Sequence, residues 1–386
     1  MWRHIASNAL TFLVVLVFLF GGALIWAQNL YVSEGPLEQA ICVQVDRGTN
    51  FRRVSENLAD DGAVSSAALL RIGADYAGKT AELKAGSYLV PEGASMEQIV
   101  DIVTRGGAST CGTEVVYRVS IARATVQVRE LDPATGRFVE IAAFNPAEDA
   151  VPDAYSTVKA QADTRYRVAL AEGVTSWQIV QELNQIDILE GEIEEIPAEG
   201  SLAPDSYEIT PGSNRADLLA RMESAQDRIL AEAWANRQDG LPYDSPEEAL
   251  VMASIIEKET GTPEERFLVS SVFVNRLRQG MRLQTDPTVI YGITRGQGVL
   301  GRGIRQSELR AETPWNTYVI NGLPPTPIAN PGRASIEAAL NPDETGYIFF
   351  VAKTLDPSDG HNFAVTLAEH NANVAAYRAL EAQRDN

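Results

Sequence analysis

Apolar and polar residues follow helical spacing over one stretch in the second half of the chain. Ser245, Pro246 and Glu248 form the signature of a helix N-terminus, with a capping residue, a first-turn proline and the acid of a capping box. The same signature recurs at residues 262–265, ahead of a second apolar stripe that Gly280 is expected to end. The pattern therefore predicts two helices joined by a tight corner.

One carboxylate falls on the packed face of the first helix. Leu250, Ala253 and Glu257 lie on one stripe by the three- and four-residue rule. Burial and the partial negative charge of the helix C-terminus both favour the protonated form of a carboxyl group there, which is the form that a general acid needs. The alternative is a buried salt bridge, with Arg276 or Arg278 of the second helix as the partner.

Glu259 follows two positions after Glu257, so the two side chains point to roughly opposite sides of the helix and cannot form a facing pair of catalytic carboxylates. Polar residues at the density of a binding site occur further along the chain. Asp286 either caps a turn before Pro287 or takes part in the chemistry, and the two interpretations carry equal weight. The candidates for a substrate cleft are Asn275, Gln284, Asp286, Tyr291, Tyr318 and Asn321.

A long apolar run near the N-terminus predicts a membrane helix. Residues 9–27 contain one polar side chain, Thr11, and are numerous enough to cross a bilayer. Arg3 precedes the run and Glu34 and Glu38 follow it, so the positive-inside rule places the N-terminus in the cytoplasm and the bulk of the chain outside it. The alternative, a cleaved signal peptide, would have a shorter apolar core and a small-residue cleavage site.

A similar order of elements occurs twice after the apolar run, which predicts a duplicated α+β module rather than a solenoid. GSYLVPEG at 86–93 aligns with DSYEITPG at 205–212. The first copy is expected to contain a strand at 42–45, helices at 51–58, 66–74 and 96–105, and a hairpin-like segment at 83–93. The second copy is expected to contain a strand at 166–170 and helices at 177–183 and 215–222.

The rest of the chain is also mixed, so the predicted fold class is α+β. Residues 111–162 alternate apolar and polar side chains, which indicates a β-rich insertion between the copies. The C-terminal part is expected to contain a proline-rich loop at 321–332, a helix at 334–340, a buried strand at 347–353 and a closing helix at 367–384. The predicted boundaries are a cytoplasmic stub at 1–8, a transmembrane helix at 9–27, a first module at 28–106, the insertion at 107–165, a second module at 166–222 and a C-terminal domain at 223–386.

Composition narrows the possible functions. The formal net charge of −20 disfavours nucleic-acid binding. His361 and His370 are the only histidines beyond the apolar run, and neither has a partner at ligand spacing, so we predict neither a metal site, a serine triad nor a cofactor. GADYAGKT at 73–80 matches a nucleotide-binding loop by its letters, but it follows a predicted helix instead of a buried strand.

The two cysteines, Cys42 and Cys111, both follow the apolar run. In an oxidising compartment they can form one disulfide that links the start of the first module to its end. Two free buried thiols are the alternative, and spacing alone does not separate these two states.

Five segments resemble a known family: ASIIEKETG (253–261), SVFVNRLRQGMRLQTDPTVIYG (271–292), ETPWNTY (312–318), NGLPPTPIANPG (321–332) and HNFAVTLAEHN (361–371). They are similar to the endolytic murein transglycosylases, the YceG-like or MltG family. The resemblance implies a bacterial inner-membrane protein with LysM-like modules and a C-terminal catalytic domain. It implies cleavage of the β-1,4 bond between N-acetylmuramic acid and N-acetylglucosamine in nascent glycan strands, which leaves 1,6-anhydromuramoyl ends and limits strand length. It also implies partnership with peptidoglycan synthases, and it maps the catalytic residue onto Glu257.

The presence of one carboxylate fits this reaction. Ordinary glycosidases need two carboxylates, whereas one acid suffices when the C6 hydroxyl of the substrate attacks its own anomeric carbon. Two alternatives stay open. In the first, the chain is a non-catalytic scaffold that binds peptidoglycan within the wall-synthesis machinery. In the second, the chain is an enzyme that hydrolyses the bond with Asp286 as the base.

Overall fold

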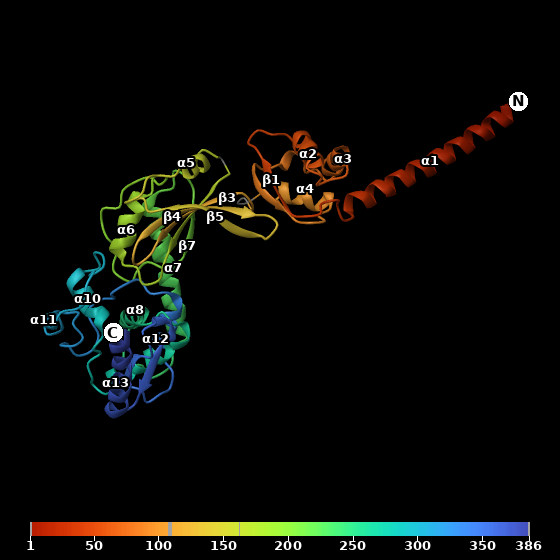
Figure 1. Cartoon of the computed structure of the whole chain (residues 1–386). Helices are drawn as coiled ribbons and strands as arrows, with labels where there is room; N and C mark the ends of the chain where they lie inside the picture. Colours follow the sequence, from red (N-terminus) through yellow and green to blue (C-terminus); the bar gives the residue numbers. More distant parts are fainter. Residues whose placement is uncertain (1, 107–109, 162, 385–386) are drawn as a thin grey trace. The chain divides into compact units, whose positions relative to one another are not determined.

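The computed structural model describes residues 2–106, 110–161 and 163–384 of the chain (Figure 1). Met1 of the predicted stub and residues 107–109 at the start of the predicted insertion lie outside the described residues. The chain forms two compact units. One unit comprises residues 1–116, 127–144 and 150–166, and the other comprises residues 117–126, 145–149 and 167–386.

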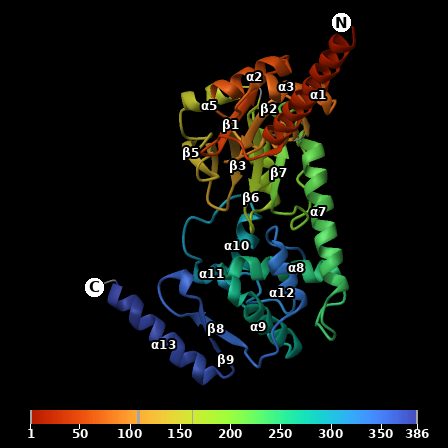
Figure 2. The same ribbon diagram turned by 90° about the vertical axis from the view of Figure 1, so that its right-hand side faces the viewer.

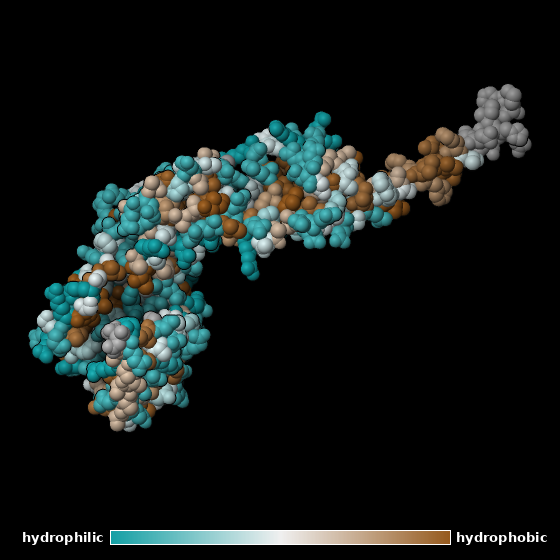
Figure 3. Space-filling view, in the orientation of Figure 1, coloured by the Kyte–Doolittle hydropathy of each residue, from teal (hydrophilic) through white to brown (hydrophobic). Residues whose placement is uncertain are grey.

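The apolar run forms the helix α1 (Trp2–Val32), which extends further in both directions than the predicted span of 9–27. Within the described residues, the segment Leu10–Val32 of α1 is the one helix that is long and apolar enough to cross a membrane. Its described side chains are mostly exposed, and brown hydrophobic atoms cover this part of the helix in Figure 3. Length and composition are therefore those of a membrane anchor.

The first module follows α1 and has its own hydrophobic core. Its elements are β1 (Ile41–Val45), α2 (Phe51–Asp60), α3 (Ala67–Tyr76), the 3-10 turn η1 (Thr80–Glu82), β2 (Gly86–Val90) and α4 (Met96–Thr104). Side-chain caps start two of these helices, since Ser66 accepts from the backbone of Leu69 and Ser95 forms a full capping box with Gln98.

The predicted hairpin at 83–93 is wrong, because this segment contributes one strand, β2. Its partner is β1, which runs antiparallel to it with Val43 opposite Tyr88 and Val45 opposite Gly86. The pairing buries Val43 and Tyr88 together in the core, which a local hairpin would not do.

Cys42 of β1 and Cys111 form a disulfide, with 5.6 Å between their Cα atoms. This distance lies in the ordinary range for a disulfide. Of the two states that the sequence left open, the structure shows the bonded one.

The alternating residues after the first module form strands, as predicted. The elements are β3 (Thr113–Val119), β4 (Ala124–Asp132), β5 (Arg137–Phe144), α5 (Asp153–Lys159), β6 (Arg165–Leu170), α6 (Ser176–Gln185) and β7 (Ser206–Ile209). The five strands form one sheet in the order β5-β4-β3-β6-β7. The two strands of the predicted second copy, β6 and β7, are therefore neighbours, as β1 and β2 are in the first.

The C-terminal part packs around the buried helix α8. Its elements are α7 (Arg215–Ala235), α8 (Pro246–Glu259), η2 (Pro263–Glu265), α9 (Arg266–Arg278), α10 (Asp286–Thr294), α11 (Gln306–Leu309), α12 (Arg333–Leu340), β8 (Phe349–Ala352), η3 (Pro357–Asp359), β9 (His361–Ala364) and α13 (Leu367–Arg384). Met252, Ile255 and Ile256 of α8 are fully buried, and α12 packs along the helix (Figure 2). Together with the N-terminal modules, this arrangement makes the fold mixed α+β, as predicted.

Four local predictions differ from the structure. The helix predicted at 215–222 continues to Ala235, because the following residues are strong helix formers. Thr262 makes no capping bond, since the 3-10 turn η2 precedes α9. The strand predicted as buried at 347–353 is shorter and half-buried, because it pairs with β9 alone. The helix α10 was not predicted, because Pro287 and Gly292 weaken its sequence signal.

Candidate active site

Glu257 lies in the last turn of α8, where the N-cap at Ser245 starts the helix as predicted. Its side chain is 6% exposed. One carboxylate oxygen, Oε2, accepts a hydrogen bond from the backbone N–H of Gly332 at 3.0 Å. The other oxygen, Oε1, lies 4.0 Å from Nη2 of Arg266. Glu257 is therefore a nearly buried carboxyl with one direct donor and one cation close by.

The cation beside Glu257 is not one of the two arginines considered from the sequence. Arg276 donates to the carbonyl oxygens of Leu283 and Ile348, and Arg278 donates to the carbonyl oxygen of Gly240. Both are committed to backbone partners within the C-terminal part, so the proposed salt bridges with Glu257 are wrong.

A second carboxylate, Glu172, shares the surroundings of Glu257. One of its oxygens lies 3.4 Å from the same Nη2 of Arg266. A Cβ atom at Gly332 would collide with the Glu172 carboxylate, so a side chain at that position would displace this carboxylate from where it lies. Burial raises the pKa of Glu172, the negative charge of Glu257 raises it further, and Arg266 acts in the opposite direction. The two carboxylates therefore meet at one guanidinium group and one glycine.

Glu172 was not among the residues predicted for the site, and it lies in a turn. The turn follows β6, far from α8 in the chain, and nothing in its local pattern indicates a contact with Glu257. Its one distinguishing mark is an acid beside Gly173, whose φ of +78° identifies a tight turn.

Asn330 in the proline-rich loop holds this turn in place. Its backbone N–H and its side-chain amide both donate to the carbonyl oxygen of Val174, at 3.0 Å each, and its carbonyl oxygen accepts from the N–H of Gly173. Its Oδ1 accepts from the backbone N–H of Leu202. Asn330 is fully buried. The loop that ends at Gly332 and the turn that carries Glu172 are therefore fastened to each other beside Glu257.

Lys258 adds a further tie to the same turn, because its ammonium group donates to the carbonyl oxygen of Gly173 at 3.1 Å. Burial lowers the pKa of Lys258, while the charges of Glu257 and Glu199 act to raise it. This lysine therefore carries positive charge between two acids.

Glu259 points to the other side of α8, as predicted. Its Oε2 accepts a hydrogen bond from the hydroxyl of Thr285 at 2.7 Å. Burial raises the pKa of Glu259, and the neighbouring charge of Asp286 raises it further. The two acids of this helix end thus have separate sets of partners.

Asp286 opens α10, and its Oδ1 accepts a hydrogen bond from the hydroxyl of Tyr318 at 2.7 Å. Burial and this bond both raise the pKa of Tyr318. The N-cap before this helix is Thr285, which makes no side-chain capping bond. Asp286 is exposed, and it lies with Glu259 instead of Glu257.

The other cleft candidates lie in three places. Gln284 is exposed with a φ of +51°, and Asn321 is exposed and accepts from Nε of Arg282 at 3.4 Å. Asn275 donates both side-chain hydrogens to the carbonyl oxygens of Thr345 and Tyr347, so its amide nitrogen holds the segment ahead of β8. The structure therefore brings Asp286 and Tyr318 into direct contact but commits Asn275 to backbone partners.

Tyr291 lines a pocket of about 840 Å³ beside the N-terminal half of α8. Its hydroxyl hydrogen-bonds to Glu199, whose pKa is raised by burial. Trp315 also lines this pocket, and the guanidinium carbon of Arg295 lies 3.7 Å from its ring centroid. The pocket thus combines a buried acid with aromatic surface, which suits the binding of a partly apolar ligand.

The family model for the YceG-like family matches residues 146–376, which is more than half of the chain. The chain belongs to the YceG-like family. The matched residues of this YceG-like chain include Glu257, Glu172, Asn330 and all six cleft candidates.

Curated relatives of this YceG-like chain are named endolytic murein transglycosylase. One from Bacillus subtilis is 27% identical over 92% of this chain and 89% of its own length. One from Streptococcus pneumoniae is 26% identical over 97% of this chain, which spans 66% of that relative. A crystal structure of a yceG-like protein from Listeria monocytogenes is 25% identical, with a TM-score of 0.44, over 87% of this chain and 99% of that one.

The described residues of this YceG-like chain contain no group of three or more His, Cys, Asp or Glu side chains that could hold a metal ion. His361 contacts the carboxylate of Glu265 through Nδ1 at 2.8 Å, and its backbone N–H donates to the same carboxylate. His361 is the first residue of β9, and Glu265 supplies partners for both its ring and its backbone N–H.

Proposed function

We propose that this protein is an endolytic murein transglycosylase. It cleaves the β-1,4 bond between N-acetylmuramic acid and N-acetylglucosamine within nascent glycan strands, leaves 1,6-anhydromuramoyl ends and so limits strand length. Its curated relatives carry this name over most of the chain. The structural observation that carries the proposal is the nearly buried carboxyl of Glu257, held beside a backbone donor and a shared arginine.

A single carboxyl can perform both proton transfers of this reaction. Protonated Glu257 gives its proton to the leaving O4 of N-acetylglucosamine as the bond to C1 of N-acetylmuramic acid breaks. The C6 hydroxyl of the same muramic acid attacks C1 and returns its proton to the Glu257 carboxylate. The new C1–O6 bond closes the anhydro ring, no water is consumed, and Glu257 ends protonated as it began.

The shared arginine can act on both carboxylates. Nη2 of Arg266 lies nearer to the oxygen of Glu172, at 3.4 Å, than to that of Glu257, at 4.0 Å. Arg266 is therefore paired more closely with Glu172 in this structure and still lies close to Glu257. When Glu257 becomes negative during the reaction, Arg266 and the N–H of Gly332 stabilise it.

Analysis of the products tests this proposal. Uncrosslinked glycan strands are incubated with the purified wild-type protein and with the Glu257→Gln variant, and the fragments are weighed by mass spectrometry. The wild type should release fragments with anhydro ends and the variant should release none while remaining folded. Anhydro-ended fragments from the variant would refute the role of Glu257.

The same assay separates both alternatives. Hydrolysis with Asp286 as the base would leave reducing ends that are heavier by one water, and the contact of Asp286 with Tyr318 near Glu259 does not favour it. A non-catalytic scaffold would release no fragments, and its cellular role would survive Glu257→Gln but not the removal of residues 42–106.

We also propose that residues 28–106 and 166–222 are LysM-like modules, separated by the β-rich insertion at 107–165 and followed by a catalytic domain at 223–386. Two neighbouring strands in each copy, β1 with β2 and β6 with β7, support the duplication. Gln284, Asp286, Tyr291, Tyr318, Asn321 and Asn275 remain our candidates for substrate binding. Retention of glycan strands by single alanine variants that stay folded tests them, and a variant that binds like the wild type removes its residue from the set.

We also propose that α1 anchors the chain in the bacterial inner membrane, with the bulk of the chain in the periplasm and residues 1–8 in the cytoplasm. The disulfide between Cys42 and Cys111 supports this orientation, because such bonds persist in oxidising compartments. A protease added to spheroplasts should digest the bulk of the chain, whereas the reverse orientation would protect it.

We further propose that peptidoglycan synthases are partners of this chain. Cross-linking in cells tests this proposal, and an experiment that captures no synthase would contradict it.

A further inference from the structure

The passage from α1 into the first module contains backbone bonds to the module instead of a free linker. The N–H of Gly35 donates to the carbonyl oxygen of Gly93 at 3.0 Å, and the N–H of Gly93 donates to the carbonyl oxygen of Leu37 at 2.9 Å. Leu37 is buried in the core of the module, and Leu30 and Tyr31 of α1 pack against that core. The end of α1 and the module therefore form one body.

Helices α3 and α4 both contact α1, and α3 lies beside its end in both views (Figures 1 and 2). The contact is tight, because a Cβ atom at Gly73 of α3 would collide with the ring of Tyr31. A hydrocarbon core of about 30 Å takes about 20 helical residues, so a span that starts at Leu10 ends near Asn29. Tyr31, and with it α3, then lies at the level of the lipid headgroups.

At that level α3 exposes an apolar stripe. Ala68, Ile72 and Tyr76 follow one another at four-residue spacing and are all exposed, Ile72 by 65% and Tyr76 by 96%. This stripe lies next to the side of α3 that contacts α1 through Gly73, as the helical spacing requires. An exposed isoleucine and tyrosine one turn apart are costly in water but suit the interfacial layer, where tyrosine is enriched.

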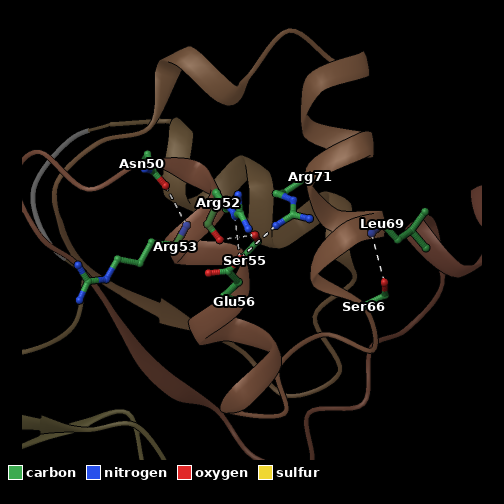
Figure 4. Close-up of polar contacts among 8 residues, drawn as sticks. All are labelled: Asn50, Arg52, Arg53, Ser55, Glu56, Ser66, Leu69 and Arg71. Carbon is green, nitrogen blue, oxygen red and sulfur yellow. Dashed lines mark hydrogen bonds and ion pairs between the residues drawn. The ribbon is translucent and has the colours of Figure 1, made fainter.

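The charged residues on the other flank of the stripe balance one another. Arg71 of α3 and Arg52 of α2 both pair with the same oxygen of Glu56, at 3.4 and 3.0 Å, and Asp75 adds a second acid (Figure 4). Two arginines and two acids leave no net charge to attract anionic lipids. The attraction of this surface to a membrane therefore rests on its apolar and aromatic side chains.

We propose that the stripe of Ala68, Ile72 and Tyr76 rests in the lipid headgroup layer, so that the first module lies against the membrane beside α1. This inference rests on the proposed membrane anchor but is independent of the proposed reaction. It assigns α3 a second point of membrane contact, in addition to the span of α1.

A fluorescent label tests the contact in the full-length chain. The native cysteines are joined in a disulfide, so one added cysteine takes a thiol-reactive, environment-sensitive dye. The side chain of Tyr76 is almost fully exposed in the fold, so a dye on Tyr76→Cys should be tolerated. Arg53→Cys is the matched control, since it is exposed on α2 and points away from α3 (Figure 4). Phe18→Cys, in the middle of α1, reports on the anchor itself.

The labelled proteins are placed in phosphatidylcholine nanodiscs with and without spin-labelled lipid. We expect spin-labelled lipid to quench the dye at position 76 several-fold more than at position 53, with a blue-shifted emission that added salt does not reverse. Equal quenching at 76 and 53 with strong quenching at 18 would overturn this inference and leave the anchor standing. Weak quenching at position 18 would overturn both. Shielding of position 76 from lipid and from aqueous iodide alike would show a protein contact and also overturn the inference.

Discussion

Glu257 and Glu259 are two residues apart on the same helix end, yet their surroundings differ in kind. Glu259 accepts from a hydroxyl supplied by the next segment of the chain, Thr285, and burial keeps its pKa above the usual range. Glu257 lies among groups that come from distant segments, namely Gly332, Arg266 and Glu172. The difference shows that two buried acids of one helix end can have unlike surroundings, and those of Glu257 include an arginine within ion-pair distance and a second acid at the same guanidinium group.

Replacement of the two acids should give the largest contrast. Glu257→Gln keeps the hydrogen bond from Gly332 possible but removes the proton that the reaction uses, so we expect activity to fall by about 10²–10⁴-fold. Glu259→Gln should retain most of the activity, because the amide oxygen can still accept from Thr285. Release of anhydro-ended fragments measures both variants. Equal losses in the two would abolish the distinction between the two sides of α8.

Replacement of Asn330, which holds the turn at Gly173 in place, should have the second largest effect. Asn330→Ala leaves the buried N–H of Leu202 without its partner and removes a bond to Val174, so we expect a loss of about 3 kcal/mol in the free energy of unfolding. Asn321→Ala is the matched control, since Asn321 is exposed with one long bond, and its effect should stay within about 0.5 kcal/mol. Urea unfolding measures both, and similar midpoints for the two would contradict the role of Asn330.

Removal of the second carboxylate should have a smaller effect with a distinctive pH signature. In Glu172→Gln, Arg266 loses its nearer partner, and a carboxyl group whose pKa is raised by burial is replaced by a neutral amide. The part of the pH–rate profile that follows the ionisation of Glu172 should therefore be absent from the variant. Activity at neutral pH should fall by about tenfold.

A purely structural role for Glu172 would lower activity equally at every pH. Glu182→Gln supplies the control, because burial raises the pKa of Glu182 as it does that of Glu172. Glu182 lies on α6, and among the described contacts it makes no bond to Arg266. Its profile should match that of the wild type.

The smallest effect should be on stability, through Glu259. Burial raises the pKa of Glu259 in the folded chain above its usual value, so the folded state binds the proton more tightly. The stabilisation is complete below the usual pKa of a glutamate, about 4.3, and is lost as the pH rises through the folded value. Relative to Glu259→Gln, the wild type should therefore become less stable as the pH is raised to 7. Unfolding at acidic and at neutral pH measures this loss, with Glu247→Gln, an exposed change on α8, as the control.

Local chemistry made one side of this comparison predictable. Ser245 and Pro246 mark the start of α8, and helical spacing from Leu250 places Glu257 on the packed face, so the buried position of this candidate follows from the sequence. The opposite direction of Glu259 follows from the same spacing. The apolar helix α1 was equally predictable, because a long apolar run needs no partner to be recognised.

Long-range contacts were not predictable in the same way. Glu172 reaches the site through a turn after β6, and Arg266 became its partner although Arg276 and Arg278 seemed equally placed by sequence. The partner of β2 was missed for the same reason, since β1 lies far from it in the chain. Each error concerns the identity of a contact partner from a distant part of the chain. That partner is determined by packing in three dimensions, which the local sequence pattern does not reveal.

The fastening of the turn at Gly173 to Asn330 also bears on how such chains are inherited. An exchange of residues 166–222 for a foreign module would carry away Glu172 together with the carbonyl oxygen of Val174, and would leave Asn330 without its partners. A gene fragment that starts at residue 223 would encode an incomplete centre for the same reason. The module that precedes α7 and the segment that carries Glu257 must therefore evolve as a single heritable piece.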